Sequence, residues 1–179
     1  GTLDYLKEKE VPMVYAATGI NDLYQEGATG NDRAVMPLQP IYKTEGRVLL
    51  ARALAATTDD VGLGASKVGV ISTTDDAGKG ILEGIQRQAE ETTAPIVYAE
   101  TAAASGTNHT AAVNQIKTAG CDVVIVAANQ APFGEILNAM RDAGLNAKVI
   151  TSYVSADTAT LNNLIVAGSI TADRPVYTT

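Results

Sequence analysis

Four short stretches of the sequence carry groups that could hold a small ligand by hydrogen bonding. They are Ala16-Ala17-Thr18-Gly19, Asp75-Asp76-Ala77-Gly78, Asn129-Gln130 and Ser152-Tyr153. A threonine hydroxyl with a nearby backbone N–H and a glycine can bind a carboxylate without any positive charge. The other three stretches offer carboxylate, amide and phenol groups. Together they indicate a binding surface and not a reaction, because no nucleophile lies beside a base.

Two of these stretches also have a simpler structural interpretation. Residues 16–19 would serve equally well as the turn from a strand into a loop. Asp75 or Asp76 would cap the helix that follows, and a capping residue can still take part in binding.

The sequence offers few groups for catalysis or metal binding. His109 is the only histidine, and we interpret it as a solvated residue at the start of a helix. A single histidine excludes a histidine-based metal cage, and we expect neither a metal nor a cofactor. The stretch Gly62-Leu63-Gly64 precedes a predicted strand. A dinucleotide-binding loop would follow a strand and open a helix, so we interpret this stretch as an ordinary loop.

The composition narrows the class of protein. The chain has 179 residues and a net charge of −7, with 46% hydrophobic and 18% charged residues, as in ordinary globular α/β proteins. An acidic chain repels phosphate backbones, so we expect no nucleic-acid partner. Cys121 is the only cysteine, which excludes an internal disulfide, and we expect it to be buried at a strand start. No apolar run in the sequence approaches the length of a membrane-spanning helix.

From about Lys43 onward, helix and strand patterns alternate along the chain. Strands are predicted at Val68–Ser72, Ile96–Ala99, Val123–Ala128 and Lys148–Thr151. Helices are predicted at Lys43–Ala56, Gly78–Glu91 and Thr110–Ala119, around Phe133–Met140, and from an Asp157 cap to about Ile165. Strands that alternate with helices at regular spacing form parallel sheets. We therefore predict a doubly wound α/β fold, in which ligands bind at the carboxyl ends of the strands.

The first forty residues follow a different pattern. A short helix is predicted at Leu3–Lys9, a strand at Val11–Ala17, a polar loop with Gly27 and Gly30, and an extended stretch at Ala34–Pro40. Two strands and one helix cannot bury a core by themselves. The residues from Ser169 onward again look extended. We therefore expect the α/β domain to be flanked by pieces of a second domain.

Four stretches resemble motifs of branched-chain amino-acid ABC transporter substrate-binding proteins, which are type I periplasmic binding proteins. Val11–Gly19 resembles the family's "VP-x-x-x-x-ATG" strand, and Gln39–Arg47 resembles its "QP-x-Y-x-TEGR" crossover. Asp75–Lys79 resembles "DDFGK", and Ser152–Ala156 resembles "NSVSAS". The motifs occur in the family's order at fitting separations across nearly the whole chain.

The resemblance implies two Rossmann-like α/β lobes that are joined by three crossovers, with the ligand between them. Residues 1–40 would be a remnant of the first lobe, residues 41–172 the second lobe, and residues 173–179 a crossover back toward the first. The ligand carboxylate would lie at Thr18 and its neighbours Ala17 and Gly19. The second lobe would contribute its loop residues Asp76, Ala77, Asn129, Gln130 and Tyr153.

The sequence departs from the family pattern at two of these positions. Ala77 replaces the aromatic residue of "DDFGK", which removes one stacking wall. No acidic residue lies near Tyr153 to pair with a ligand ammonium group, a role that Asp76 could take instead. A branched-chain amino acid, an aromatic acid, an amide and another small carboxylate therefore all remain open as ligands.

The resemblance implies an extracytoplasmic solute receptor, free or lipid-anchored, that docks on the permease of an ABC transporter. Its signal sequence is expected to lie outside this chain, because Gly1–Glu10 carries charges instead of an apolar stretch. One alternative is the ligand-sensing domain of a regulator or surface receptor with the same fold. An α/β enzyme is disfavoured by the missing nucleophile and base. We expect the isolated chain to bind ligand weakly, and either to self-associate through residues 1–40 or to hold them disordered.

Overall fold

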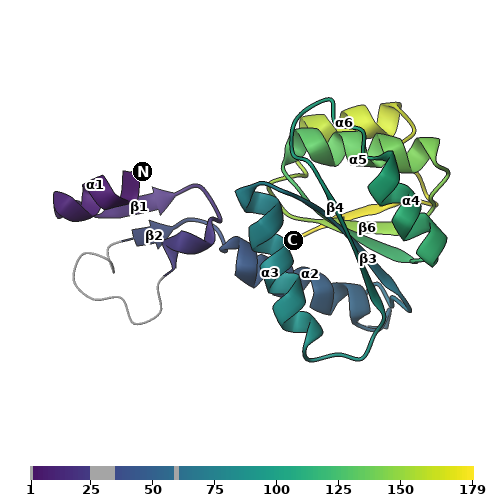
Figure 1. The fold of residues 1–179 in the computed structure, drawn as a ribbon, viewed down its shortest axis with the longest axis horizontal. Helices are drawn as coiled ribbons and strands as arrows, with labels where there is room; N and C mark the ends of the chain where they lie inside the picture. Colours follow the sequence, from purple (N-terminus) through teal and green to yellow (C-terminus); the bar gives the residue numbers. More distant parts are fainter. Residues whose placement is uncertain (1, 25–34, 59–60) are drawn as a thin grey trace.

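The computed structural model describes residues 2–24, 35–58 and 61–179, which form a small N-terminal unit beside a larger α/β body (Figure 1). The predicted polar loop with Gly27 and Gly30 lies outside the described residues. The helices are α1 (Thr2–Glu8), α2 (Tyr42–Leu54), α3 (Asp76–Ala89), α4 (Thr110–Ala119), α5 (Gln130–Asp142) and α6 (Thr158–Val166). The strands are β1 (Met13–Ala16), β2 (Val35–Pro37), β3 (Val68–Thr73), β4 (Ile96–Thr101), β5 (Val123–Ala127), β6 (Lys148–Thr151) and β7 (Val176–Thr178). A short 3₁₀ helix, η1, covers Asn21–Leu23.

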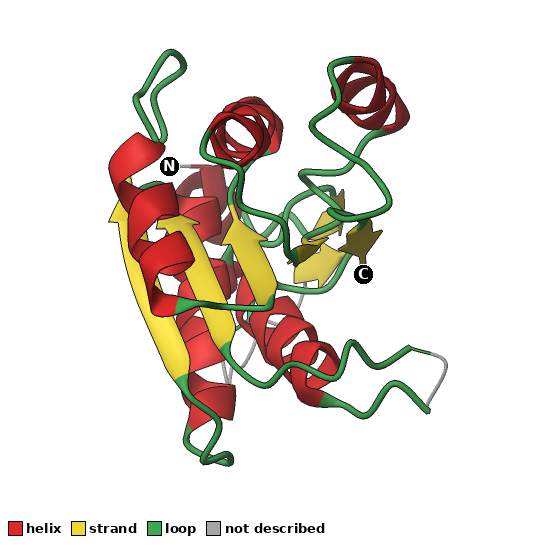
Figure 2. Cartoon of the chain, turned by 90° about the vertical axis from the view of Figure 1, so that its right-hand side faces the viewer, coloured by secondary structure: helices red, strands yellow, loops and turns green. Residues whose placement is uncertain are grey.

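The larger body is a parallel sheet with strand order β4-β3-β5-β6-β7. Every residue of β3 and β5 is buried, as expected for apolar strands that are covered on both faces. Along β5, Val123 and Ile125 pack with α2 and α3, whereas Val124 and Val126 pack with α4, α5 and α6. Helices accordingly lie on both faces of the sheet (Figure 2). The prediction of a doubly wound α/β fold is confirmed.

Helices α2 and α3 pack very closely because glycines face each other at their contact. A Cβ atom at Gly46 would lie 2.1 Å from the Ile81 carbonyl oxygen, and one at Gly84 would lie 2.0 Å from the Lys43 carbonyl oxygen. Backbone atoms cannot move aside as flexible side chains can, so only glycine fits at these two positions. This packing fixes the start of α2, which adjoins the candidate site.

Local signals in the sequence place several ends of elements correctly. Asp157 caps α6 by accepting hydrogen bonds from the backbone N–H groups of Ala159 and Thr160. Gly120 ends α4 in the left-handed conformation, with φ of 70°. Cys121 is buried at the start of β5, as predicted.

The small N-terminal unit has little core of its own. Strands β1 and β2 form a two-stranded parallel sheet, and β1 is shorter than the predicted strand Val11–Ala17. The exposed fractions of Tyr5, Val14 and Leu38 are 60%, 55% and 62%. Apolar residues in this unit thus remain largely open to solvent.

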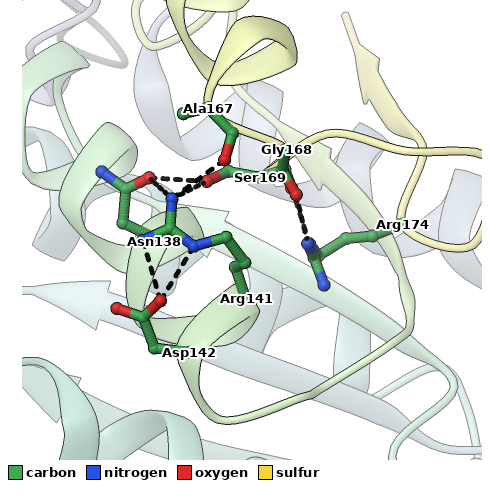
Figure 3. A network of polar contacts seen from close by, with 7 residues as sticks. All are labelled: Asn138, Arg141, Asp142, Ala167, Gly168, Ser169 and Arg174. Carbon is green, nitrogen blue, oxygen red and sulfur yellow. Dashed lines mark hydrogen bonds and ion pairs between the residues drawn. The ribbon is translucent and has the colours of Figure 1, made fainter.

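The last part of the chain returns along the sheet as its edge strand. Residues 173–179 were expected to cross back toward a first lobe, and within them β7 pairs with β6. Arg174 is only 3% exposed, and its guanidinium donates to the carbonyl oxygens of Ser169, Gly168 and Leu145 at 2.6–3.2 Å. Arg141 of α5 also contacts the turn after α6 (Figure 3). This network anchors the segment that leads into β7, and the lobe boundaries themselves stay a prediction.

Candidate ligand-binding site

The parallel sheet places three of the four polar stretches at one edge. Strands β3, β5 and β6 are neighbours, and the loops that follow them carry Asp75, Asn129 and Tyr153. The Asn129 side-chain amide donates to Oδ2 of Asp75 at 2.8 Å, which ties the first two loops together. These three loops therefore lie at one edge of the sheet, here called the polar edge, as the order of the parallel strands requires.

The two aspartates after β3 have different roles. Asp75 is the N-cap of α3, because its Oδ1 accepts from the Gly78 N–H at 3.0 Å and from the Thr73 hydroxyl at 2.7 Å. Asp76 is exposed at the first position of α3, and no partner for its carboxylate is found among the described residues. Asp76 is thus the aspartate that is available to a ligand.

Ala77 lies in the core of the body and not on its polar edge. Its exposed fraction is 2%, and it packs in the cluster of α2, α3 and the sheet. The Ala77 methyl group therefore offers no surface to a ligand, and only its backbone N–H at the start of α3 is left for a contact.

The loop after β5 presents its side chains to solvent. Asn129 is the N-cap residue of α5, but its side chain makes no capping hydrogen bond and donates to Asp75 instead. Gln130 is exposed at the first position of α5. Neither side chain is packed beneath a helix.

The loop after β6 is held by a buried glutamate that the sequence analysis did not single out. Glu45 of α2 is 2% exposed and accepts from the Ser152 hydroxyl at 2.7 Å and from the Tyr153 N–H at 3.1 Å. The Tyr153 hydroxyl is buried and has no hydrogen-bond partner among the described residues. Burial, followed by the charge of Glu45 and the neighbouring Tyr42, raises the pKa of Tyr153 to about 12.

The fourth polar stretch, Ala16–Gly19 of the N-terminal unit, meets the body at Tyr42. A Cβ atom at Gly19 would lie 2.6 Å from Cδ1 of Tyr42 and 2.9 Å from the Pro40 carbonyl oxygen, so glycine is required there. Tyr42 is also close enough to Tyr153 to affect its pKa. Tyr42 thus adjoins Gly19 of the N-terminal unit and lies in the same part of the body as Tyr153. Among the described residues, no hydrogen bond joins that stretch to Asp76, Asn129 or Gln130.

A second set of polar contacts ties the N-terminal unit to the body. The Asn21 side chain accepts from the Lys43 N–H and donates to Glu83, each at 2.8 Å. The Lys43 ammonium lies 2.6 Å from Glu83, and this hydrogen bond lowers the pKa of that carboxyl group. Sequence reasoning missed Asn21 and Glu45. The one available signal for Glu45 was its place in the crossover motif, where it interrupts an apolar helix face.

The interpretation of His109 as a solvated residue is wrong. Its exposed fraction is 2%. Nδ1 lies 2.8 Å from the Thr101 hydroxyl at the end of β4, and Nε2 lies 3.3 Å from the Glu135 carboxylate on α5. Both ring nitrogens thus have partners, which makes burial of the imidazole possible. The N–H of Gly106, with Ser105 and His109, lowers the pKa of Glu135.

A family model for periplasmic binding proteins matches residues 1–179. The chain belongs to this family. Members of this family are solute-binding proteins and not enzymes, which confirms the expectation of a non-catalytic protein. A search of curated proteins found no match to this chain. No helix in the described ranges is long and apolar enough to cross a membrane.

Solved structures of periplasmic binding proteins share the fold. An extracellular ligand-binding receptor from Verminephrobacter eiseniae is 16% identical, with a TM-score of 0.77 over 99% of this chain and 46% of its own. A branched chain amino acid ABC transporter from Thermus thermophilus with bound valine is 19% identical, with a TM-score of 0.67 over 92% of this chain and 40% of its own. A solute binding protein of an ABC transporter from Rhodopseudomonas palustris, in complex with 3,4-dihydroxy benzoic acid, is 16% identical, with a TM-score of 0.64 over 84% of this chain and 39% of its own. The chain spans less than half the length of each of these proteins.

Proposed function

We propose that this chain is part of an extracytoplasmic receptor that binds a small carboxylate between two lobes and delivers it to an ABC transporter permease. The observation that supports this most is the polar edge formed by the loops after β3, β5 and β6, which Asn129 and Asp75 join at 2.8 Å. Such an edge is where open parallel sheets bind ligands.

Ala17, Thr18 and Gly19 would hold the ligand carboxylate. The Thr18 oxygen accepts one long hydrogen bond of 3.4 Å from the Ile20 N–H. Because the hydroxyl acts there as an acceptor, its own hydrogen remains available for a carboxylate oxygen. The buried Gly19 beside Tyr42 keeps this stretch against the body.

The opposite end of the ligand would face the second-lobe groups. These are the Asp76 carboxylate, the side chains of Asn129, Gln130 and Tyr153, and the Ala77 N–H. The exposed Asp76 would attract an ammonium group if the ligand is an amino acid, whereas the exposed amides of Asn129 and Gln130 would bind hydroxyl groups. The Tyr153 hydroxyl is buried, so Tyr153 would offer the accessible part of its ring. Valine and 3,4-dihydroxybenzoate, the ligands of two structural relatives, both carry a carboxylate. They support the class of ligand without choosing between these two compounds.

Binding would close the two lobes around the solute, and the closed receptor would dock on the permease outside the cytoplasm. The test is calorimetry on a protein that contains both lobes, with L-valine and 3,4-dihydroxybenzoate as probes. L-Valinamide, which lacks the carboxylate, is the matched control and is expected not to bind. Failure of both carboxylates to bind would contradict the proposed ligands, and equal binding of L-valinamide would contradict carboxylate recognition.

Thr18→Val tests the carboxylate contact directly. The hydroxyl is removed with little change in shape, so we expect binding to weaken by about 1.5–3 kcal/mol, the range for a hydrogen bond to a charged group. Stability is expected to change little because Thr18 follows the end of β1. Thr118→Val on the exposed face of α4 is the control and leaves affinity unchanged. Unchanged affinity of Thr18→Val would remove Thr18 from the site.

A further inference from the structure

Glu45 is a buried carboxylate that is held only by hydrogen bonds. It is 2% exposed and accepts from the Ser152 hydroxyl at 2.7 Å, from the Tyr153 N–H at 3.1 Å, and from the Thr179 hydroxyl. Within the described part of the chain, no lysine, arginine or histidine forms an ion pair with it. A buried charge without a counter-ion is costly, so its three donors must be held in place.

These donors come from two different parts of the chain. Ser152 and Tyr153 form the loop after β6, and Thr179 follows the edge strand β7. Glu45 itself lies in the first turn of α2, directly after the segment that leads from the N-terminal unit into the body. One side chain therefore joins the start of the body, its last strand and the Tyr153 end of the polar edge.

Helix α2 holds β7 at a second point, the carbonyl group of Thr178, through a side chain other than Glu45. The Arg52 guanidinium donates to the Thr178 carbonyl oxygen at 2.7 Å and lies 5.7 Å from the centre of the Tyr177 ring. Its other contact is to the Val61 carbonyl oxygen. Arg52 thus provides an internal reference, because it also fixes α2 against β7, but among the described residues it forms no hydrogen bond with Ser152 or Tyr153.

We propose that Glu45 is a positioning residue that sets the Ser152–Tyr153 loop in its binding geometry relative to the two ends of the body. This inference rests on the proposed function, because it makes the loop part of the ligand site. Lobe closure would require movement where the chain passes between the lobes. Two such passages are expected in this chain, near residue 41 and within residues 173–179, and Glu45 is hydrogen-bonded beside each of them. The carboxylate therefore couples the position of Tyr153 to the crossovers.

The first test compares the affinity of two variants in a protein with both lobes. Glu45→Ala leaves the Tyr153 N–H and two hydroxyls without their acceptor, so we expect binding of L-valine or 3,4-dihydroxybenzoate to weaken about tenfold or more. Arg52→Ala is expected to lower the melting temperature but to change affinity less than about twofold. Glu45→Gln can still accept from the Tyr153 N–H and can donate to the Ser152 oxygen, so affinity is expected to recover to within about threefold of the parent.

The second test needs no ligand. Hydrogen exchange at the Tyr153 amide is expected to be faster in Glu45→Ala than in Arg52→Ala, because only the first variant removes the acceptor of that N–H. If Glu45→Ala does not fold, Ser152→Ala removes one donor at lower cost and is expected to weaken binding about threefold. Hydrogen exchange in Ser152→Ala is then measured at the backbone amides of Tyr153 and Val154 and compared with the parent.

The outcomes separate this inference from the proposed function. Equal affinity and equal Tyr153 exchange in Glu45→Ala and Arg52→Ala would overturn the positioning role, since Glu45 would then act only on stability. If the parent protein binds neither probe, the proposed ligands fail, while exchange at Tyr153 still decides whether Glu45 holds the loop. Two results together support the inference. Glu45→Ala loses affinity that Glu45→Gln recovers, and the Tyr153 amide stays protected from exchange in Arg52→Ala.

Discussion

The N-terminal unit and the α/β body use similar apolar strand residues with very different results. Strand β5 is buried along its whole length, whereas Val14 in β1 is 55% exposed. Helices cover both faces of the sheet in the body, but α1 and two short strands cannot cover one another. Burial is thus decided by what packs over a strand and not by its own residues. The body can therefore present a fixed polar edge, whereas several apolar side chains of the N-terminal unit stay exposed.

The sharpest test of this comparison uses one leucine from each region. Leu49 of α2 is fully buried and Leu38 is 62% exposed. Leu49→Ala is expected to lower the free energy of unfolding by about 2–5 kcal/mol, because it removes buried methyl groups and leaves a cavity. Leu38→Ala is expected to change it by less than about 0.5 kcal/mol in this chain. Both are measured by urea unfolding followed by circular dichroism.

A large loss of unfolding free energy in Leu38→Ala would show that Leu38 is buried in solution, for example by a second copy of the chain. In a protein that contains both lobes, the difference in unfolding free energy between the two variants is expected to shrink because Leu38 becomes buried. Sedimentation at several protein concentrations would distinguish burial by a second copy from burial by the other lobe.

Local patterns were enough to predict most elements of the body. The predicted helix Thr110–Ala119 and strand Lys148–Thr151 match the structure at both ends. Periodicity, caps and glycine stops act within a few residues, so a single sequence displays them. The same signals predicted β1 too long, because its ends are determined by pairing with β2 and not by its own composition.

The candidate site could be predicted only in part. Polar residues after strands were visible, and the strand order brings Asp75 and Asn129 together across 54 residues. The contact between Glu45 and Ser152 spans 107 residues, and no local pattern indicates it. His109 was mispredicted for the same reason, because its partner Glu135 lies on another helix. Ala77 was expected in the loop before the helix, but it is the second residue of α3, and the direction of its side chain depends on how α3 packs.

The second prediction concerns the anchor of the last strand. Arg174→Ala removes a buried guanidinium and leaves the carbonyl groups of Ser169, Gly168 and Leu145 without their donor. We expect a loss of about 2–4 kcal/mol in unfolding free energy. Arg87→Ala is the control, because that side chain is 59% exposed and, within the described ranges, pairs with Glu90 alone. Equal effects of the two variants would show that β7 is held by its strand pairing alone.

The smallest effect is expected at Tyr153, close to where the two regions meet. Its buried hydroxyl has no partner among the described residues. Removing an unpaired buried hydroxyl relieves a desolvation cost, so Tyr153→Phe is expected to raise the free energy of unfolding by about 1 kcal/mol at neutral pH. Tyr24→Phe, at a position that is 65% exposed, is the matched control and is expected to change nothing.

The same variant is expected to change the response to alkaline pH. The pKa of Tyr153 is raised from 10.0 to about 12, first by burial and then by the charge of Glu45. The unfolded chain therefore loses this proton before the folded protein does. The free energy of unfolding is therefore unaffected by this titration below pH 10, and it falls as the pH rises to about 12. Urea unfolding across this range is expected to show a smaller decline for Tyr153→Phe than for the parent or Tyr24→Phe. A parallel decline in all three proteins would mean that the Tyr153 hydroxyl is solvated, and that the two regions are less closely joined at Tyr42 than the structure indicates.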